Sequence, residues 1–295
     1  MSEVATKLTE PTEYVQFWND TLADKFDRFR HILMEGLSYH SRVPLEGLTV
    51  TSGSRILDVG CGWGDTAIQL ARKTGPDGYV LGVDCVEQFL IKARDDAGKA
   101  GLDNIQFITE DVERYPFDGR FDLCFSRFGM MFFENPVLAM KNIRRALRPG
   151  GELIFIVWRS SDYNPWLGMA KEVVLRYLPE PGEGARSCGP GPFSMASTEV
   201  VSKQLEIAGF RDINFEQLDG PVTVGNSVQD AINFQLAIGP AGEVFREAGE
   251  LAEQQRPEIE EALREALAHY QDDSGCIVMP SSSWCISARN PESGH

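Results

Sequence analysis

Short apolar runs alternate with segments of helical spacing over residues 52–160. The apolar runs predict strands at 54–60, 79–84, 104–111, 121–128 and 152–158. The intervening segments 66–75, 87–101 and 136–151 place their apolar residues three or four positions apart, as helices do. Strands without polar alternation are typical of a parallel sheet that helices cover on both faces. The pattern therefore predicts an α/β fold with a doubly wound, mostly parallel sheet.

The flanking regions follow other patterns. Residues 12–40 have helical spacing, and we expect Pro44 to end that region. Beyond Trp158 the regular alternation of strand and helix patterns ends. We expect Pro257 to break the last helical segment. The elements predicted there are helices at 164–178 and 197–210, a Gly/Pro-rich loop at 179–193, a strand at 211–220, helical segments at 227–238 and 241–270, and a strand at 276–290.

These patterns predict one enlarged domain with a helical cap. The cap comprises residues 1–48, and the main domain residues 49–295. Within the main domain we distinguish a core at 52–160, a helical insert or lid at about 161–196, and a C-terminal part at 197–295 with acidic helices at 227–270.

Composition narrows the range of functions. The chain has 295 residues, 42 % of them hydrophobic, with no apolar run long enough to predict a membrane-spanning helix. The first twenty residues lack the pattern of a signal peptide, so we expect a cytoplasmic protein. A net charge of −16 opposes binding to a phosphate backbone and argues against a nucleic-acid partner. The six cysteines form no Cys-x-x-Cys pair and no zinc-like group with histidines, so no metal is expected.

A glycine-rich loop follows the first predicted strand. It reads LDVGCGWGD over residues 57–65, with glycines at positions 60, 62 and 64. A dinucleotide-binding loop would place its third glycine at position 65, where this chain has Asp65. A carboxylate there opposes a pyrophosphate and disfavours a nicotinamide oxidoreductase. S-adenosylmethionine carries a cationic sulfonium and a cationic amino group, so a loop containing Asp58 and Asp65 suits it better.

The chain resembles the class I S-adenosylmethionine-dependent methyltransferases. It is similar to the small-molecule branch that contains the ubiquinone and menaquinone C-methyltransferases, strongly over about residues 50–160 and weakly elsewhere. The resemblance rests on ILDVGCGWGDTAIQLA, GVDCVEQFL, EDVERYPF and FDLCFSRFGMMFFENPVLAMKNIRRALRPGG. It implies a seven-stranded Rossmann-like sheet and methyl transfer from S-adenosylmethionine to a small organic acceptor.

The resemblance also implies cofactor contacts along the first two strands. Asp58 would order the loop or meet the methionine amino group, and Gly60 and Gly62 would bring backbone against the methionine part. Asp84 would accept hydrogen bonds from the ribose hydroxyls, since two carboxylate oxygens match a diol. Cys85 would lie beside the adenine.

Further contacts are expected beyond the third and fourth strands. The resemblance implies that Asp111 accepts from the adenine amino group, that the backbone N–H of Val112 meets a ring nitrogen, and that Ser126 lies below the sulfonium. Tyr14 and Trp18 share a helix face at i, i+4, so we expect them to close over the cofactor.

The methyl acceptor is constrained mainly by exclusion. The Asn-Pro-Pro-aromatic motif of amino-methylating nucleic-acid enzymes is missing after the fourth strand, and no acidic metal ligands replace it. An aromatic or apolar acceptor is expected beneath the N-terminal cap. Its candidate walls are Tyr14, Phe17, Trp18, Phe128, Met131, Trp158, Tyr163, Trp166 and Phe193.

Four residues are candidates for a catalytic role. The candidate bases are His31, His40 and Tyr163. His31 lies four residues before Glu35, with which it can pair on a helix. Arg127 either binds an acidic acceptor or is a structural ion-pair partner. Displacement at a sulfonium needs a base only if the acceptor must first lose a proton.

Two alternatives stay open at the level of sequence. A non-catalytic protein that binds S-adenosylmethionine or its demethylated product would have the same loop and the same acids. The acidic segment at 241–270 keeps one apolar stripe, which either packs on the core or forms a homodimer surface.

Overall fold

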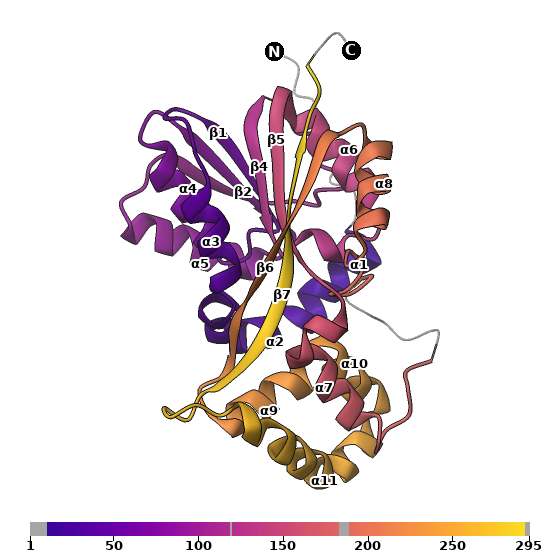
Figure 1. Cartoon of the computed structure of the whole chain (residues 1–295). Coiled ribbons are helices and arrows are strands. Elements are labelled where there is room, and N and C mark those ends of the chain that lie inside the picture. Colours follow the sequence, from indigo (N-terminus) through magenta and orange to yellow (C-terminus); the bar gives the residue numbers. More distant parts are fainter. Residues whose placement is uncertain (1–10, 119, 183–188, 293–295) are drawn as a thin grey trace.

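A seven-stranded sheet forms the centre of the molecule, and the computed structural model describes residues 11–118, 120–182 and 189–292 (Figure 1). The strand order is β3-β2-β1-β4-β5-β7-β6, and β7 runs antiparallel to both of its neighbours. This confirms the predicted doubly wound, mostly parallel, seven-stranded fold. The strands are β1 (Arg55–Val59), β2 (Tyr79–Asp84), β3 (Ile105–Thr109), β4 (Phe121–Arg127), β5 (Leu147–Trp158), β6 (Arg211–Gly225) and β7 (Ile277–Arg289).

Both faces of the sheet are covered, as the continuously apolar strands predict. In β1, Ile56 packs with α4 (Asp65–Thr74) and α5 (Glu87–Lys99), whereas Leu57 belongs to the core of the opposite face. That second core includes residues of α6 (Pro136–Ala146) and α8 (Thr198–Ala208). Because successive strand residues point to opposite faces, an uninterrupted apolar run is needed to serve both cores.

The parallel registers bring four strand ends together. Val59 of β1 pairs with Val83 of β2, and Asp84 pairs with Thr109 of β3. Phe125 of β4 pairs with Asp58 on the other side of β1. Loops that follow these strands therefore meet at one edge of the sheet, where ligands bind in doubly wound folds.

The N-terminal segment crosses this edge as a series of short helices. These are α1 (Glu13–Phe17), the π-helical turn η1 (Trp18–Leu22), α2 (Ala23–Arg28), the π-helical turn η2 (Ile32–Gly36) and α3 (Tyr39–Gly47). Asp27 anchors the segment to α5 through an ion pair with Lys92 at 2.6 Å. The prediction that Pro44 ends the helical region was wrong, because Pro44 lies inside α3.

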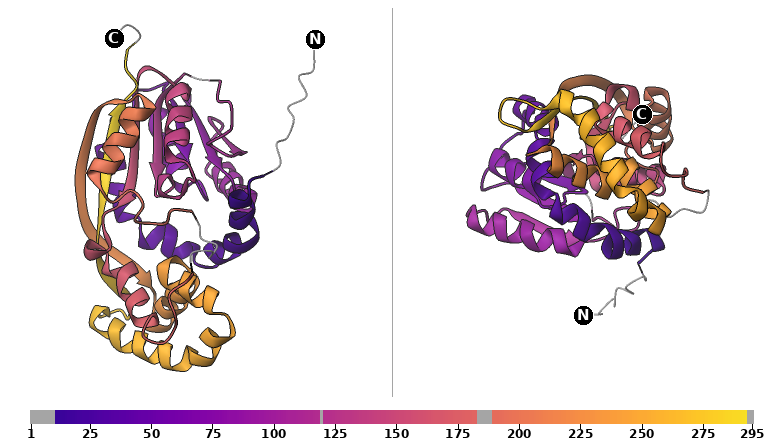
Figure 2. Two further views of the ribbon diagram at one scale, coloured as in Figure 1. Left: turned by 90° about the vertical axis from the view of Figure 1, so that its right-hand side faces the viewer. Right: turned by 90° about the horizontal axis from the view of Figure 1, so that it is seen from below.

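A helical lobe lies beyond this edge of the sheet, as Figures 1 and 2 show from three directions. It contains α7 (Pro165–Val174), α9 (Val228–Ala237), α10 (Gly239–Ala248) and α11 (Glu250–Leu267). Here α7 contacts α10 and α11, although more than sixty residues separate them in the sequence. The insert after β5 and the acidic C-terminal helices thus pack together. The predicted loop at 179–193 lies partly outside the described residues.

Pro257 does not break the acidic helix, so that prediction was also wrong. It lies within α11, which runs without interruption to Leu267. Pro257 is exposed, so water can satisfy the carbonyl group that a proline leaves without a donor. The apolar stripe Ile259, Leu263 and Leu267 is buried in the large core and holds the helix in place.

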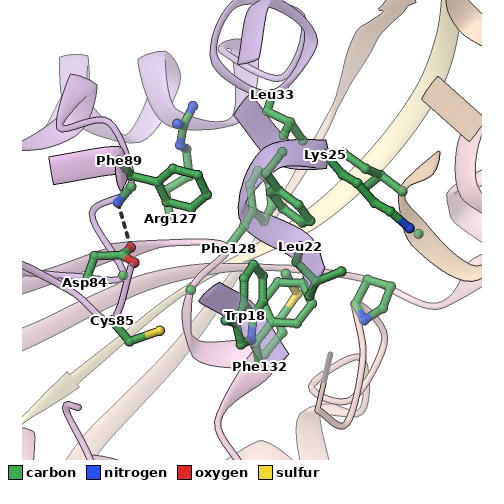
Figure 3. Close-up of a pocket in the computed structure, with 18 of the residues that line it drawn as sticks. Trp18, Leu22, Lys25, Leu33, Asp84, Cys85, Phe89, Arg127, Phe128 and Phe132 are labelled. Atoms are coloured by element: carbon green, nitrogen blue, oxygen red, sulfur yellow. Dashed lines mark hydrogen bonds between the residues drawn. The ribbon is translucent and has the colours of Figure 1, made fainter. Parts of the chain in front are cut away.

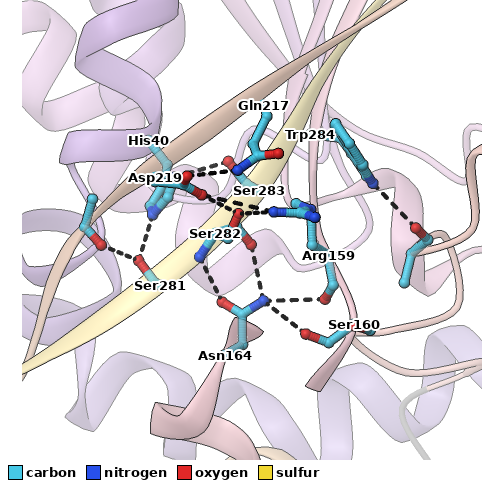
Figure 4. Close-up of polar contacts among 12 residues, drawn as sticks. His40, Arg159, Ser160, Asn164, Gln217, Asp219, Ser281, Ser282, Ser283 and Trp284 are labelled. Carbon is cyan, nitrogen blue, oxygen red and sulfur yellow. Dashed lines mark hydrogen bonds and ion pairs between the residues drawn. The ribbon is translucent and has the colours of Figure 1, made fainter. Parts of the chain in front are cut away.

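Buried polar contacts join α3, β5 and β7 near the lobe (Figure 4). The His40 ring contacts the hydroxyls of Ser283 through Nδ1 at 2.8 Å and of Ser281 through Nε2 at 2.6 Å. Asn164 donates to the backbone oxygen of Ser282 at 2.9 Å, and its side-chain oxygen accepts from the Ser282 backbone N–H at 3.1 Å. These contacts fix the ends of β5 and α7 against β7.

Candidate functional site

A single continuous pocket occupies the space between the strand ends, the N-terminal helices and the helical lobe (Figure 3). One half is formed by loops after β1, β2, β3 and β4, and we call it the strand-end half. The other half, the helical half, is formed by α1, α2, α7, α9 and α10 together with the end of β5. Both halves line the same cavity, so two ligands can meet inside it.

Asp84 is the central polar residue of the strand-end half. Its Oδ2 accepts from the backbone N–H of Gly62 at 2.9 Å, and its Oδ1 accepts from that of Val86 at 3.0 Å. Burial raises the pKa of Asp84, and the backbone donors oppose that rise. A carboxylate has about four acceptor sites, so Asp84 can still accept from a ligand diol.

Gly62 leaves open space in which a ligand can contact the protein backbone. Its φ angle is +52°, and a methyl group added at Gly62 would meet nothing within 4 Å. At Gly64, by contrast, an added methyl group would lie 2.8 Å from Phe107 and 2.9 Å from Ala93. Gly64 is therefore required by packing, whereas Gly62 faces the pocket.

The loop after β3 lines the pocket next to Asp84. Asp111, Val112 and Cys85 all contribute to its wall. One oxygen of Asp111 accepts from the backbone N–H of Glu113 at 2.9 Å, and the other lies 3.5 Å from Arg114. Cys85 is held near the N-terminal segment because its carbonyl accepts from the side chain of Asn19 at 3.0 Å.

Asp58 and Ser126 lie behind the pocket wall. Both are fully buried, and neither is a lining residue of the pocket. Asp58 accepts from Thr66 Oγ1 at 2.6 Å, and its other oxygen, Oδ1, has no partner among the described residues. Burial raises the pKa of Asp58 to about 7, against the effect of the Thr66 hydrogen bond. Ser126 donates to the carbonyl of Val59 at 2.7 Å and so joins β4 to β1.

Arg127 lines the pocket but is paired within the chain. Its guanidinium lies 2.9 Å from the Asp65 carboxylate, and the two side chains are only 10 % and 17 % exposed. Arg127 Nη1 also donates to the Ser41 hydroxyl at 3.5 Å. This geometry favours the structural interpretation of Arg127 that the sequence left open.

Tyr14 and Trp18 reach the pocket from the N-terminal segment, as their spacing predicts. The Tyr14 hydroxyl donates to the carbonyl of Phe132. The Trp18 ring packs edge-on against Phe26 at 5.0 Å and Phe132 at 5.4 Å between ring centroids. Trp18 is only 8 % exposed, and its indole Nε1 has no partner among the described residues.

Aromatic rings form the boundary between the two halves. Phe128 stacks on Trp158 with centroids 3.9 Å apart, and Trp158 meets Trp166 edge-on at 5.1 Å. Phe128 has a φ of +59°, a strained value for a bulky residue that places its ring across the end of β4. Of the predicted walls, Tyr163 and Phe193 alone are not lining residues within the described part of the chain.

His31 and Tyr163 lie away from the pocket. His31 is partnered by Asp230 at 3.0 Å rather than by Glu35. Tyr163 is 52 % exposed, with Arg159 over its ring at 3.8 Å. Neither residue lines the cavity, so a reacting group inside it is out of their reach.

Several lining residues escaped sequence reasoning. Lys25 lies seven residues after Trp18, a helical spacing that the sequence does contain. Phe234, Ile238 and Arg246 come from α9 and α10, where nothing in the sequence indicates proximity to the glycine loop. Over the described residues, no group of acidic, histidine and cysteine side chains could hold a metal, and no helix could cross a membrane.

Comparison with known proteins identifies the central part of the chain. A family model described as a methyltransferase domain matches residues 50–173. The ubiquinone/menaquinone biosynthesis C-methyltransferase UbiE of Azotobacter vinelandii is 28 % identical over 215 residues, 68 % of this chain and 84 % of that protein. The protein of the same name from Pseudomonas entomophila is 36 % identical over 141 residues, 46 % of this chain and about half (54 %) of that protein.

Solved structures share the fold. Phosphoethanolamine N-methyltransferase 2 of Haemonchus contortus, in complex with S-adenosyl-L-methionine, is 17 % identical with a TM-score of 0.57 and covers 96 % of this chain and 61 % of that chain. The YcgJ protein of Bacillus subtilis is 15 % identical with a TM-score of 0.56 and covers 85 % of this chain and 97 % of that chain. At these identities the likeness concerns the fold alone.

Proposed function

We propose that this chain is an S-adenosylmethionine-dependent methyltransferase of small molecules, in which the strand-end half of the pocket holds the cofactor and the helical half the acceptor. The observation that carries this proposal is the continuity of the pocket. An acidic edge with an exposed backbone turn and an aromatic chamber share one cavity. The described part of the predicted cap at 1–48 then covers the cofactor, and the described part of the insert at about 161–196 forms the acceptor wall with the C-terminal helices.

The cofactor contacts follow from the positions of the polar groups. Asp84 accepts from the ribose hydroxyls, and Asp111 with the Val112 N–H meets the adenine, beside Cys85. Gly60 and Gly62 allow the methionine part to approach the backbone. Asp58 and Ser126 act from behind by fixing the glycine loop and the end of β4. Tyr14 and Trp18 cover the cofactor, which, when bound, supplies an electrophilic methyl group.

The acceptor site follows from the aromatic boundary. Phe128, Trp158 and Trp166 give an apolar aromatic wall that suits an aromatic or otherwise apolar acceptor. The aromatic rings exclude water and orient the acceptor for in-line attack, which accounts for much of the acceleration in such displacements. No residue is assigned as a general base, because His31 and Tyr163 lie outside the pocket.

The test is transfer of a labelled methyl group from S-adenosylmethionine to a panel of acceptors. Because the curated relatives are named for ubiquinone and menaquinone biosynthesis, the panel should include quinol head groups beside phenols and amines. We expect transfer to at least one aromatic acceptor and loss of transfer in Trp158→Ala, with cofactor affinity retained. Cofactor binding without transfer to any acceptor would instead support the non-catalytic alternative.

A further inference from the structure

The helical half of the pocket contains a lysine that has no ion-pair partner among the described residues. Lys25 lies in α2 and lines the cavity on the side of Trp18 and Phe128 away from Asp84 (Figure 3). Ion pairs are recorded for several surface lysines, but none involves Lys25 among the described residues. A half-buried ammonium in a largely apolar chamber loses hydration that nothing in the described chain replaces.

A second cation, which is itself ion-paired, lines the same end of the pocket. Arg246 of α10 lines the same region and lies 2.6 Å from Glu247 and 5.2 Å from the Phe17 ring. Glu243 also lines this end. Burial lowers the pKa of Lys25, and the charge of Arg246 lowers it further.

The N-terminal segment connects this cation to the acceptor chamber. Trp18 and Leu22 of η1 and Lys25 of α2 all line the cavity. Together they present an aromatic ring, an aliphatic side chain and an ammonium to the cavity. A complementary molecule has an apolar body and a negative charge at its far end.

We infer that the methyl acceptor carries an anionic group, a carboxylate, sulfonate or phosphate, which Lys25 binds at the end of the pocket away from the cofactor. This inference rests on the proposed function and specifies its substrate class. The anion replaces lost hydration at Lys25 and orients the acceptor, so that its reactive end faces the strand-end half.

The experiment uses two matched probes and the full-length protein saturated with S-adenosylhomocysteine. Anilinonaphthalene sulfonate combines an apolar aromatic body with an anion, and phenylnaphthylamine is the same body without the sulfonate. Calorimetry gives the affinity of each. We expect Lys25→Met to weaken sulfonate binding about tenfold or more while the neutral probe changes less than about twofold. Lys25→Arg should retain sulfonate binding, and the exposed Lys141→Met controls for net charge.

The outcomes separate this inference from the function on which it rests. Equal effects of Lys25→Met on both probes, or no effect on the sulfonate, would overturn the anionic acceptor. Glu243→Gln should bind the sulfonate at least as tightly as the wild type, and weaker binding would also contradict the inference. Failure of the wild type to bind S-adenosylhomocysteine would instead refute the proposed cofactor half.

Discussion

The strand-end half of the pocket is assembled from residues 60–129, in loops that directly follow the strands. The helical half combines two segments that are far apart in the sequence, 14–37 and 158–246. In the first half, position is set by parallel register, because neighbouring strand ends are hydrogen-bonded together. In the second, position depends on packing among α7, α9 and α10 and on their contacts with the N-terminal segment, such as Phe29 with Phe234. Local sequence motifs can therefore specify the strand-end half, whereas the helical half depends on contacts between distant segments.

This difference has a functional consequence. The strand-end half can keep one ligand while the helical half changes, because substitutions in α9 or α10 leave the sheet register untouched. Acceptor choice is then separable from cofactor choice. The following predictions test where that separation holds.

The largest effect should come from the ion pair at the boundary of the two halves. Arg127→Met leaves the Asp65 charge in a site with little exposure, so we expect a loss of about 3 kcal/mol in the free energy of unfolding. Adding Asp65→Asn should recover most of it. Arg42→Met, which breaks an exposed pair, should cost less than about 0.5 kcal/mol in the same denaturation experiment. Unchanged stability in Arg127→Met would favour an acceptor-binding role instead.

His40, which lies behind the acceptor chamber, should make the folded protein less stable in acid. Burial lowers the pKa of His40 to about 4, against a small opposing effect of Asp219. Between the unfolded pKa of about 6.5 and this value, the unfolded chain binds a proton that the folded chain does not. His40 thus stabilises the fold fully above about pH 6.5, and this contribution is lost as the pH falls.

The measurement compares urea unfolding of wild type and His40→Gln at about pH 7.5 and about pH 4.5. We expect the wild type to lose about 2–3 kcal/mol more than the variant over this interval. Asp58, whose raised pKa changes stability in the opposite direction, titrates in both proteins and cancels in the difference. His269→Gln, at an exposed position, should behave like the wild type.

Cofactor affinity should depend on Asp84. Asp84→Ala removes the proposed acceptor of the ribose diol, and we expect binding of S-adenosylmethionine to weaken by about 1–3 kcal/mol in calorimetry. The exposed Asp103→Ala is the matched control and should leave affinity unchanged. An affinity of Asp84→Ala equal to that of the wild type would mean that the ribose lies elsewhere.

The smallest effect on stability is expected at Gly62. Gly62→Ala places a methyl group in open space, so its cost in the free energy of unfolding is the left-handed backbone alone, about 1 kcal/mol. The loss in the free energy of cofactor binding should be larger than this. Gly64→Ala should show the reverse order, because its methyl group meets Phe107 and Ala93. Thermal unfolding and calorimetry on both variants distinguish the two roles, and an unaltered affinity in Gly62→Ala would move the cofactor away from this turn.

Sequence reasoning located pocket residues at the strand ends and on the N-terminal segment, but it missed those of α9 and α10. Asp84, Asp111 and Gly62 follow predicted strands, and all three line the pocket. Tyr14 and Trp18 were found from their i, i+4 spacing. Arg246 and Phe234 could not be found, because their approach to the pocket depends on how the lobe packs. His31 and Tyr163 have suitable chemistry but lie outside the cavity.

The sequence by itself determined the order of strands and helices, the glycine turn and the acids at the strand ends. These follow from local spacing and from the rule that parallel strands end at a common edge. Tertiary structure alone decided that α7 and α10 meet, that Arg127 is paired with Asp65, and that Lys25 lines the helical half of the pocket. Those outcomes depend on contacts between segments distant in the chain, and local periodicity carries no information about such distances.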